Sequence, residues 1–370
     1  MISVLHTADV HLGAKLLKLG RKSEDQRIQI QRTFESIVNL AIEKRVNLFI
    51  IAGDLFDASH PDKYLIDFVL SNLAKLNDNK IYTCIAAGTH DFYAEGNIFS
   101  AVDASGLSYI KIFTDPNVKE YAIDELSLIV FCNTSLSNKT TASPLDGIRR
   151  NENYVYNVAI AHGSVQIPGK SSPNDSPIAF EEIESSGMDY VALGHWHNQQ
   201  NVSKGNVTAW YSGAPEMIDL DQTGSGKVLL ATLSGNKEVS VESIQTGKRL
   251  FDSIRVDISS CGTFEDIITK VRQNADLNLV RSVTIEGIAS LDFAVLDTNE
   301  IIKRLDDDFF FMQIRNNSHV LDRDIEAAFE DSLLKQKFLE HVKNMHKEVD
   351  IEKEVLQLGI LLLDGKTKVY

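Results

Sequence analysis

The chain has 370 residues, of which 43% are hydrophobic, and a formal net charge of −15. This length and ordinary hydrophobic content predict a globular protein of two or three domains. The acidic charge excludes a protein held on nucleic acid by bulk charge alone, but it allows a nucleic-acid enzyme with a local basic strip or a cationic metal centre.

The elements at the start of the chain predict an α/β domain. Strands are expected at residues 2–5, 46–52, 81–87, 110–113, 121–123, 126–132, 157–161, 190–193 and 227–233, and helices at 25–45, 62–76 and 97–105. The helix at 25–45 has apolar residues at helical spacing. The segment 46–52 is almost continuously apolar, which is typical of a central parallel strand covered on both faces.

The pattern changes from about residue 241. Short strands at 253–258, 283–288 and 309–314 alternate with helices at 263–273 and 298–305, which predicts a small α+β domain. Residues 323–363 are charged and carry apolar residues at helical spacing. This tail is either a helix docked on its own protein or an arm that binds a partner. We therefore divide the chain into residues 1–240, 241–320 and 321–370.

Composition and the chain's opening predict a cytoplasmic protein. The three cysteines Cys84, Cys132 and Cys261 are widely spaced and fit neither a disulfide framework nor a zinc knuckle. The first residues lack the basic region of a secretory leader. The apolar run at 356–363 is much shorter than the ~20 residues of a membrane span. We expect a reducing environment and no membrane association.

Polar side chains follow several of the expected strands. Asp9 and His11 come just after the first strand, and side chains two residues apart on extended backbone point the same way. Open α/β sheets bind their ligands at the carboxyl ends of strands. Taken alone, this pair is better explained as a turn aspartate beside a surface histidine.

Four later strand ends carry similar residues, namely Asp54, His90, His162, and the pair His195 and His197. Carboxylate and imidazole ligands together suit manganese, iron or zinc. Their number is too large for one ion, whereas two ions about 3.5–4 Å apart can share a carboxylate and lower the pKa of a water from ~15.7 towards ~7. Such a centre also neutralises the charge of a phosphodiester under attack, so the sequence predicts a two-metal phosphodiesterase.

The order of these motifs resembles that of the calcineurin-like metallophosphoesterases. The motifs are Asp9-Val-His11-Leu-Gly, Gly53-Asp54-Leu-Phe-Asp57, Gly88-Thr89-His90-Asp91, His162-Gly163, Gly194-His195-Trp-His197 and Tyr211-Ser-Gly-Ala-Pro-Glu216. Within that family the chain is similar to the SbcD-type DNA-repair exonucleases, relatives of the meiotic recombination eleven nuclease. Its short C-terminal arm is similar to that of the YhaO-like branch.

The resemblance implies a fold and a set of ligands. The fold is a four-layer αββα core, an α+β sandwich, with a small α+β capping domain and a C-terminal helical arm. The implied ligands are Asp9, His11 and His197 for the first metal, Asp54 as the bridge, and His162 and His195 for the second metal. His90 is implied to protonate the leaving oxygen, oriented by Asp91.

The resemblance also implies an activity and partners. The activity is that of a nuclease with two Mn²⁺ ions in double-strand-break repair, a 3′-to-5′ exonuclease on duplex ends and an endonuclease on single strands. The implied partners are DNA, a second copy in a homodimer, and an SMC-like coiled-coil ATPase held by the arm. Lys15 and Arg21 follow the first motif, either in a solvated loop or in contact with the DNA backbone.

One motif departs from the family pattern, because Thr89 stands where the family has an asparagine that ligates the second metal. A threonine hydroxyl is a shorter and weaker donor to a metal. A weak second site, a non-catalytic DNA-binding or scaffold subunit, and a small-nucleotide phosphodiesterase all remain open. Residues 223–227 resemble a phosphate-binding loop, but they lack its first glycine, and Val228 stands where it has serine or threonine. We assign no such loop.

Overall fold

The computed structural model of the chain describes residues 1–370 except 94–98, 100–105, 115–118, 168–171, 173, 291–292, 294–295, 322–324, 326, 331, 346–348, 364 and 366–370. It also leaves out the side chains of 349–350, 352–354 and 361. Apart from Phe99, the predicted helix at 97–105 lies outside the described residues. The chain forms two compact units, Met1–Leu250 and Phe251–Tyr370.

The first unit contains two sheets. In the first sheet the strand order within this unit is β14-β13-β1-β2-β3-β4. The strands are β1 (Ile2–Thr7), β2 (Leu48–Ala52), β3 (Tyr82–Ala86), β4 (Ile110–Phe113), β13 (Gly224–Leu233) and β14 (Val239–Asp257). Strands β1 to β4 run parallel, and β13 pairs antiparallel with β1.

The second sheet has the order β11-β12-β10-β7-β6-β5. Its strands are β5 (Glu120–Ile123), β6 (Leu128–Cys132), β7 (Tyr156–His162), β10 (Tyr190–Gly194), β11 (Gln200–Asn201) and β12 (Thr208–Tyr211). The inner strands β6, β7, β10 and β12 are parallel, so their carboxyl ends lie along one edge. A separate ribbon pairs β8 (Ser164–Val165) with β9 (Pro177–Ile178), and η2 (Asp124–Leu126) precedes β6.

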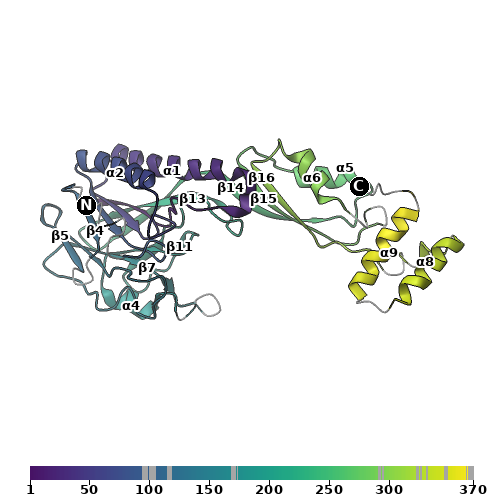
Figure 1. The fold of residues 1–370 in the computed structure, drawn as a ribbon. Helices are drawn as coiled ribbons and strands as arrows, with labels where there is room; N and C mark the ends of the chain where they lie inside the picture. Colours follow the sequence, from purple (N-terminus) through teal and green to yellow (C-terminus); the bar gives the residue numbers. More distant parts are fainter. Residues whose placement is uncertain are drawn as a thin grey trace. The chain divides into compact units, whose positions relative to one another are not determined.

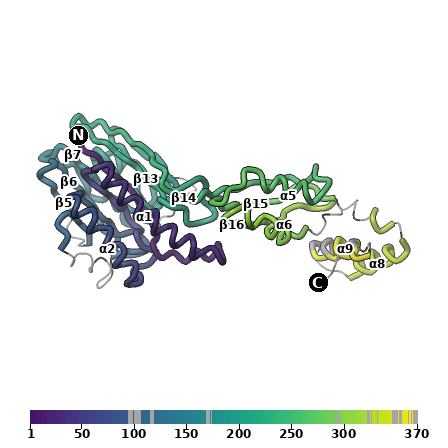
Figure 2. The backbone as a smooth tube through the Cα atoms, turned by 90° about the horizontal axis from the view of Figure 1, so that it is seen from above, coloured from purple at the N-terminus to yellow at the C-terminus, as the bar shows by residue number. Residues whose placement is uncertain are grey.

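Helices cover the outer faces of both sheets. The segment η1 (Leu17–Lys22) leads into α1 (Ser23–Lys44), which lies beside α2 (Lys63–Asp78) over the first sheet (Figures 1 and 2). Phe34 of α1 and Leu73 of α2 share a core with Phe49 of β2. The helix α4 (Phe180–Ser186) packs its Ile183 on the outer face of the second sheet, against residues such as Val191.

Apolar residues of the two sheets meet in a separate core between these covered faces. Ile50 of β2 lies in one cluster with Val158 of β7 and Ala192 of β10. Alternate residues of each inner strand therefore face a helix layer and the opposite sheet in turn, as the period of a strand requires. The result is a four-layer αββα sandwich, which confirms the predicted fold class.

The second unit is a small α+β structure with its own core. The end of β14 pairs with β15 (Leu279–Glu286), which pairs in parallel with β16 (Phe311–Asn316). Its helices are α5 (Phe264–Arg272), α6 (Thr298–Leu305), α8 (Leu333–Lys343) and α9 (Val349–Leu363). The hydroxyl of Thr263 caps α5 and the carboxylate of Asp297 caps α6, each by accepting backbone N–H bonds.

Two predicted boundaries differ from the structure. The predicted division at 240 falls inside β14, and the two compact units instead divide after Leu250. The chain does not turn at 240, because β14 continues through this point as one strand. The tail predicted as one helix contains two, α8 and α9. Val342 of α8 and Leu356 of α9 belong to the core of the second unit, so the tail docks on its own unit. Among the described residues, no helix is long and apolar enough to cross a membrane.

Candidate metal centre

Backbone hydrogen bonds join the loops that follow β1 and β2. The Asp9 amide donates to the Gly53 carbonyl at 3.1 Å, and the His11 amide donates to the Asp54 carbonyl at 3.0 Å. Asp9, His11 and Asp54 all have positive φ, at 54°, 51° and 50°. Non-glycine residues rarely adopt this conformation, and it concentrates at functional sites.

These dihedral angles correct one step of the sequence argument. Asp9 and His11 were expected on extended backbone, but β1 already ends at Thr7. Both residues are in left-handed turns beyond the strand. Their side chains nevertheless converge: a carboxylate oxygen of Asp9 and ring nitrogens of His11 and His197 lie within 4.8 Å of one another.

The loops of the second sheet are bonded to those of the first. The His195 amide donates to both carboxylate oxygens of Asp9, at 2.9 and 3.1 Å. Nδ1 of His162 lies 2.9 Å from the Ala52 carbonyl oxygen, to which it donates. A Cβ on Gly194 would lie 1.9 Å from that same oxygen, so the two sheets can approach here only where this residue is glycine.

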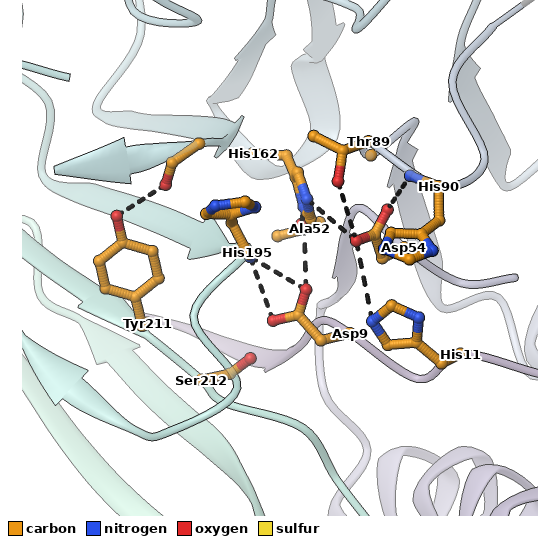
Figure 3. Close-up of polar contacts among 12 residues, drawn as sticks. Asp9, His11, Ala52, Asp54, Thr89, His90, His162, His195, Tyr211 and Ser212 are labelled. Atoms are coloured by element: carbon orange, nitrogen blue, oxygen red, sulfur yellow. Dashed lines mark hydrogen bonds and ion pairs between the residues drawn. The ribbon is translucent and has the colours of Figure 1, made fainter. Parts of the chain in front are cut away.

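Asp54 lies at the centre of the cluster (Figure 3). Its Oδ2 atom is 3.2 Å from Nε2 of His162 and 3.7 Å from Nε2 of His11. The Thr89 hydroxyl donates to the same oxygen at 3.3 Å, and the His90 amide donates to Oδ1 at 2.8 Å. One carboxylate therefore meets groups from three of the predicted motifs besides its own.

Two buried nitrogens in this cluster make no hydrogen bond among the described residues and lie near the charge of Asp54. Nε2 of His11 and Nε2 of His162 make no hydrogen bond to any described residue. In both rings Nδ1 is engaged, in His11 with Asp57 at 3.0 Å and in His162 with Ala52. A neutral imidazole that donates through Nδ1 presents a lone pair at Nε2, which is the arrangement of a metal-ligating histidine.

Electrostatics favour a cation at this position. Burial alone would raise the pKa of Asp54, but the imidazoles of His162 and His11 hold it well below its usual range. Burial would lower the pKa of His162, whereas the carboxylates of Asp54 and Asp9 raise it to about 10, so a cation that binds here would displace a proton from this ring. Two fully buried carboxylates thus concentrate negative charge. A bound cation would neutralise this charge and occupy the unpartnered nitrogens, so the residues fit a divalent metal.

The predicted ligands differ in which of their atoms are available to bind a metal. Asp9, Asp54 and His162 also have ligand atoms within 4.8 Å of one another, beside the group that contains His197. The ring of His195 lies 5.4 Å from that of His162, but its Nε2 bonds Asp175 at 2.9 Å. Asp175 comes from the loop before β9 and was not predicted. Its contact leaves Nδ1 as the ring nitrogen that His195 can offer.

The structure corrects the partner of His90. Asp91 is fully buried and accepts the backbone amides of Gly88 at 2.7 Å and Phe56 at 3.1 Å, so it fixes the loop backbone. The ring of His90 faces Asp57 instead, with Nδ1 3.4 Å from Oδ1. Asp57 also bonds Nδ1 of His11. Asp57 was not predicted as a site residue, although it ends the Gly53-to-Asp57 motif.

These contacts change the protonation of both groups. The hydrogen bond to Asp57 raises the pKa of His90 to about 9 against the effect of burial. Burial would raise the pKa of Asp57, but its bonds to His11 and His90 hold it below the usual range. His90 is half-exposed and is therefore accessible to a substrate.

The two predicted basic contacts lie on the surface. Lys15 and Arg21 are exposed, Lys15 in the loop after the first motif and Arg21 within η1. The backbone carbonyl of Lys15 accepts from Arg27 at 3.2 Å. A contact of Lys15 or Arg21 with DNA stays a prediction.

The family model of the calcineurin-like phosphoesterases matches residues 2–199, which include every candidate ligand described above. This chain belongs to the calcineurin-like phosphoesterase family. The resemblance drawn from the motifs is confirmed, and the protein is a metal-dependent phosphoesterase. The match also explains the cluster, because the family's chemistry takes place at a metal centre.

The chain is also similar to two curated relatives, over longer stretches than the family model covers. The chain is 26% identical over 288 residues to the DNA double-strand break repair protein Mre11 of Aeropyrum pernix, covering 73% of this chain and 67% of the relative. It is 22% identical over 300 residues to the uncharacterized metallophosphoesterase YhaO of Bacillus subtilis, covering 78% and 72%. A crystal structure of a dimetal phosphatase from Danio rerio matches at 12% identity and a TM-score of 0.38, covering 66% of this chain and 96% of that one.

Proposed function

We propose that this phosphoesterase is a Mn²⁺-dependent DNA nuclease that cuts phosphodiester bonds at the cluster around Asp54. The observation that carries the proposal is the pair of buried Nε2 atoms of His11 and His162, which make no hydrogen bond to any described residue and face one carboxylate oxygen. The likeness to a relative named as a DNA double-strand break repair protein supports DNA as the substrate.

The ligands divide into two sets that share Asp54. Asp9, His11 and His197 would hold one ion, and His162 and His195 would hold the other with the Thr89 hydroxyl beside them. Two divalent cations there would supply the positive charge that lowers the pKa of an attacking water and neutralises the phosphate. The protein's own groups fix the positions of these side chains through the backbone bonds between the loops.

His90 would act as the general acid. A group that protonates the leaving oxygen must be within reach of the substrate and free of the metal. The ring of His90 is half-exposed and lies beside His11, with 4.8 Å between the ring centroids. Asp57 orients this ring and favours its protonated form, so the proton is held at the edge of the cluster.

The proposed biological role is DNA double-strand-break repair together with an SMC-like coiled-coil ATPase. Helix α9 supports a partner surface, because Ile351, Val355, Leu358 and Leu362 are exposed and recur at intervals of four, three and four residues. Such a spacing places apolar side chains on one face of a helix, where a partner helix can bind. The homodimer, the 3′-to-5′ exonuclease activity and the single-strand endonuclease activity rest on the resemblance.

A cleavage assay tests this proposal. Purified protein with Mn²⁺ is given an end-labelled linear duplex and a single-stranded DNA circle. We expect shortening of the duplex and opening of the circle, with both activities lost in Asp54→Ala and His90→Ala. His60→Ala is the matched control, because His60 is exposed and lies outside the cluster. Cleavage that survives Asp54→Ala would overturn the proposal.

A further inference from the structure

A cavity adjoins the metal centre on the side of His197. It has a volume of about 270 Å³, and His197 and Asn198 form its boundary with a second cavity that contains His195. The remaining lining residues include the polar residues Ser212, Ser225, Gln199 and Lys227. The cavity is therefore polar and shares a wall with a proposed metal ligand.

The charge of this cavity is opposite to that of the chain. The protein has 52 acidic residues against 37 lysines and arginines, yet the described residues that line the cavity include a lysine and no carboxylate. Lys227 is partly buried, and its ammonium group makes no ion pair or hydrogen bond to any described residue. A partly buried lysine without a counter-ion beside a polar cavity is suited to an anionic ligand.

The backbone holds Lys227 in place. Lys227 belongs to β13, where Leu229 pairs antiparallel with His6 of β1. Residues before Leu229 therefore lie beside the end of β1 that leads into Asp9. The Lys227 amide donates to the Ala214 carbonyl at 3.3 Å, and a Cβ on Gly226 would lie 2.0 Å from the Pro215 carbonyl oxygen. The segment 224–227 is thus packed tightly against the loop after β12.

We propose that this cavity binds a second phosphate of the substrate strand, next to the phosphate that is cut, and that Lys227 is its positioning residue. The proposal rests on the proposed nuclease function and adds that strands with at least two consecutive phosphates are its preferred substrates. An ammonium group can pair with a phosphate as a point charge, and the Ser225 hydroxyl and the Gln199 amide are lining groups that can donate to the remaining oxygens. The phosphate-loop-like segment 223–227 thereby acquires a role without forming a P-loop.

Substrates that differ by one phosphate distinguish the effect of this subsite on cleavage from the effect of the metal centre. Cleavage of bis(p-nitrophenyl) phosphate and of a thymidine dinucleotide, each with one phosphate, is compared with cleavage of a thymidine trinucleotide, which has two. In Lys227→Met we expect kcat/KM for the trinucleotide to fall by about 10-fold, the lower range for a charge-assisted hydrogen bond. The two single-phosphate substrates should be cut as in the unsubstituted protein. Lys204→Met, at an exposed lysine away from the cavity, is the matched control.

A binding measurement keeps the test independent of turnover. In the His90→Ala background, fluorescence anisotropy gives the Kd of a labelled single strand over a range of salt concentrations. Loss of one phosphate contact should reduce the slope of log Kd against log salt by about 0.7. An unchanged slope in Lys227→Met would overturn the subsite, as would an equal loss of activity on all three substrates. A slope that falls while no substrate is cleaved would support the subsite and contradict the nuclease.

Discussion

His162 and Asp54 come from different sheets, yet their side chains meet with Nε2 and Oδ2 3.2 Å apart. His162 ends β7 of the second sheet, and Asp54 follows β2 of the first. A cation bound between them would therefore link the two halves of the sandwich. Metal binding should stabilise the fold as well as enable chemistry.

This link leads to a measurable effect of metal on stability. At a Mn²⁺ concentration about 100 times its Kd, binding to the folded state alone adds about 2.7 kcal/mol to the free energy of unfolding. We expect thermal unfolding to shift upward with Mn²⁺ and back with EDTA, and Asp54→Asn to abolish the shift. His60→Ala should retain it. An equal shift in Asp54→Asn would place the metal elsewhere.

Thr89→Asn should strengthen the second metal site. The Thr89 hydroxyl already reaches Oδ2 of Asp54 at 3.3 Å, and an amide side chain is longer and carries a carbonyl oxygen, which is a better donor to a metal. We expect Mn²⁺ affinity at that site to rise by about 10- to 100-fold, the size of effect typical of changes next to a metal. Isothermal titration calorimetry measures it. Thr89→Val, which removes the hydroxyl at constant shape, should weaken the site; if neither variant changes affinity, Thr89 does not face the metal.

Asp57 and Asp91 should respond differently to the same substitution. Asp57→Asn weakens the contacts to both His11 and His90, so metal affinity or kcat should fall by about 10- to 100-fold with little change in stability. Asp91→Asn cannot accept both backbone amides equally well, so unfolding should cost about 1–3 kcal/mol less. Metal titration and urea denaturation of the two variants separate these effects. The opposite pattern would restore Asp91 as the residue that orients His90.

Glu216 is expected to anchor helix α1 and the middle of strand β14. Its buried carboxylate accepts the Thr33 hydroxyl at 2.7 Å and the backbone amides of Lys248 at 2.9 Å and Arg249 at 3.0 Å. Glu216→Ala leaves these donors unpaired, each at a cost of about 1–3 kcal/mol. Urea denaturation should show the loss. The exposed Glu238→Ala should change stability by less than about 0.5 kcal/mol. Equal stability of the two variants would exclude this anchor.

Most of the site could be predicted because its residues lie directly after apolar strands. Asp54 and His162 are separated from β2 and β7 by no more than one residue, so the strands themselves bring them together. The positive φ angles of Asp9 and His11 could not be predicted, since they arise from the backbone bonds between two loops. It could also not be predicted that His90 contacts Asp57 and not Asp91. Asp91 instead accepts two backbone amides, and this depends on the folded loop.

The tail shows the same limit. The apolar spacing of residues 323–363 predicted helix, but it contained no signal for the division into α8 and α9. It also left two interpretations open, a helix docked on its own protein and a partner-binding arm. The structure has features of both: Leu356 is buried in the second unit, while Leu358 is exposed.

Anomalous diffraction from crystals soaked in manganese chloride tests the central claim most directly. The account expects two peaks, both within coordinating distance of the Asp54 carboxylate, one near Nε2 of His11 and one near Nε2 of His162. A single peak would contradict the two-metal centre and favour a decayed second site. No peak at Asp54 would contradict the centre altogether.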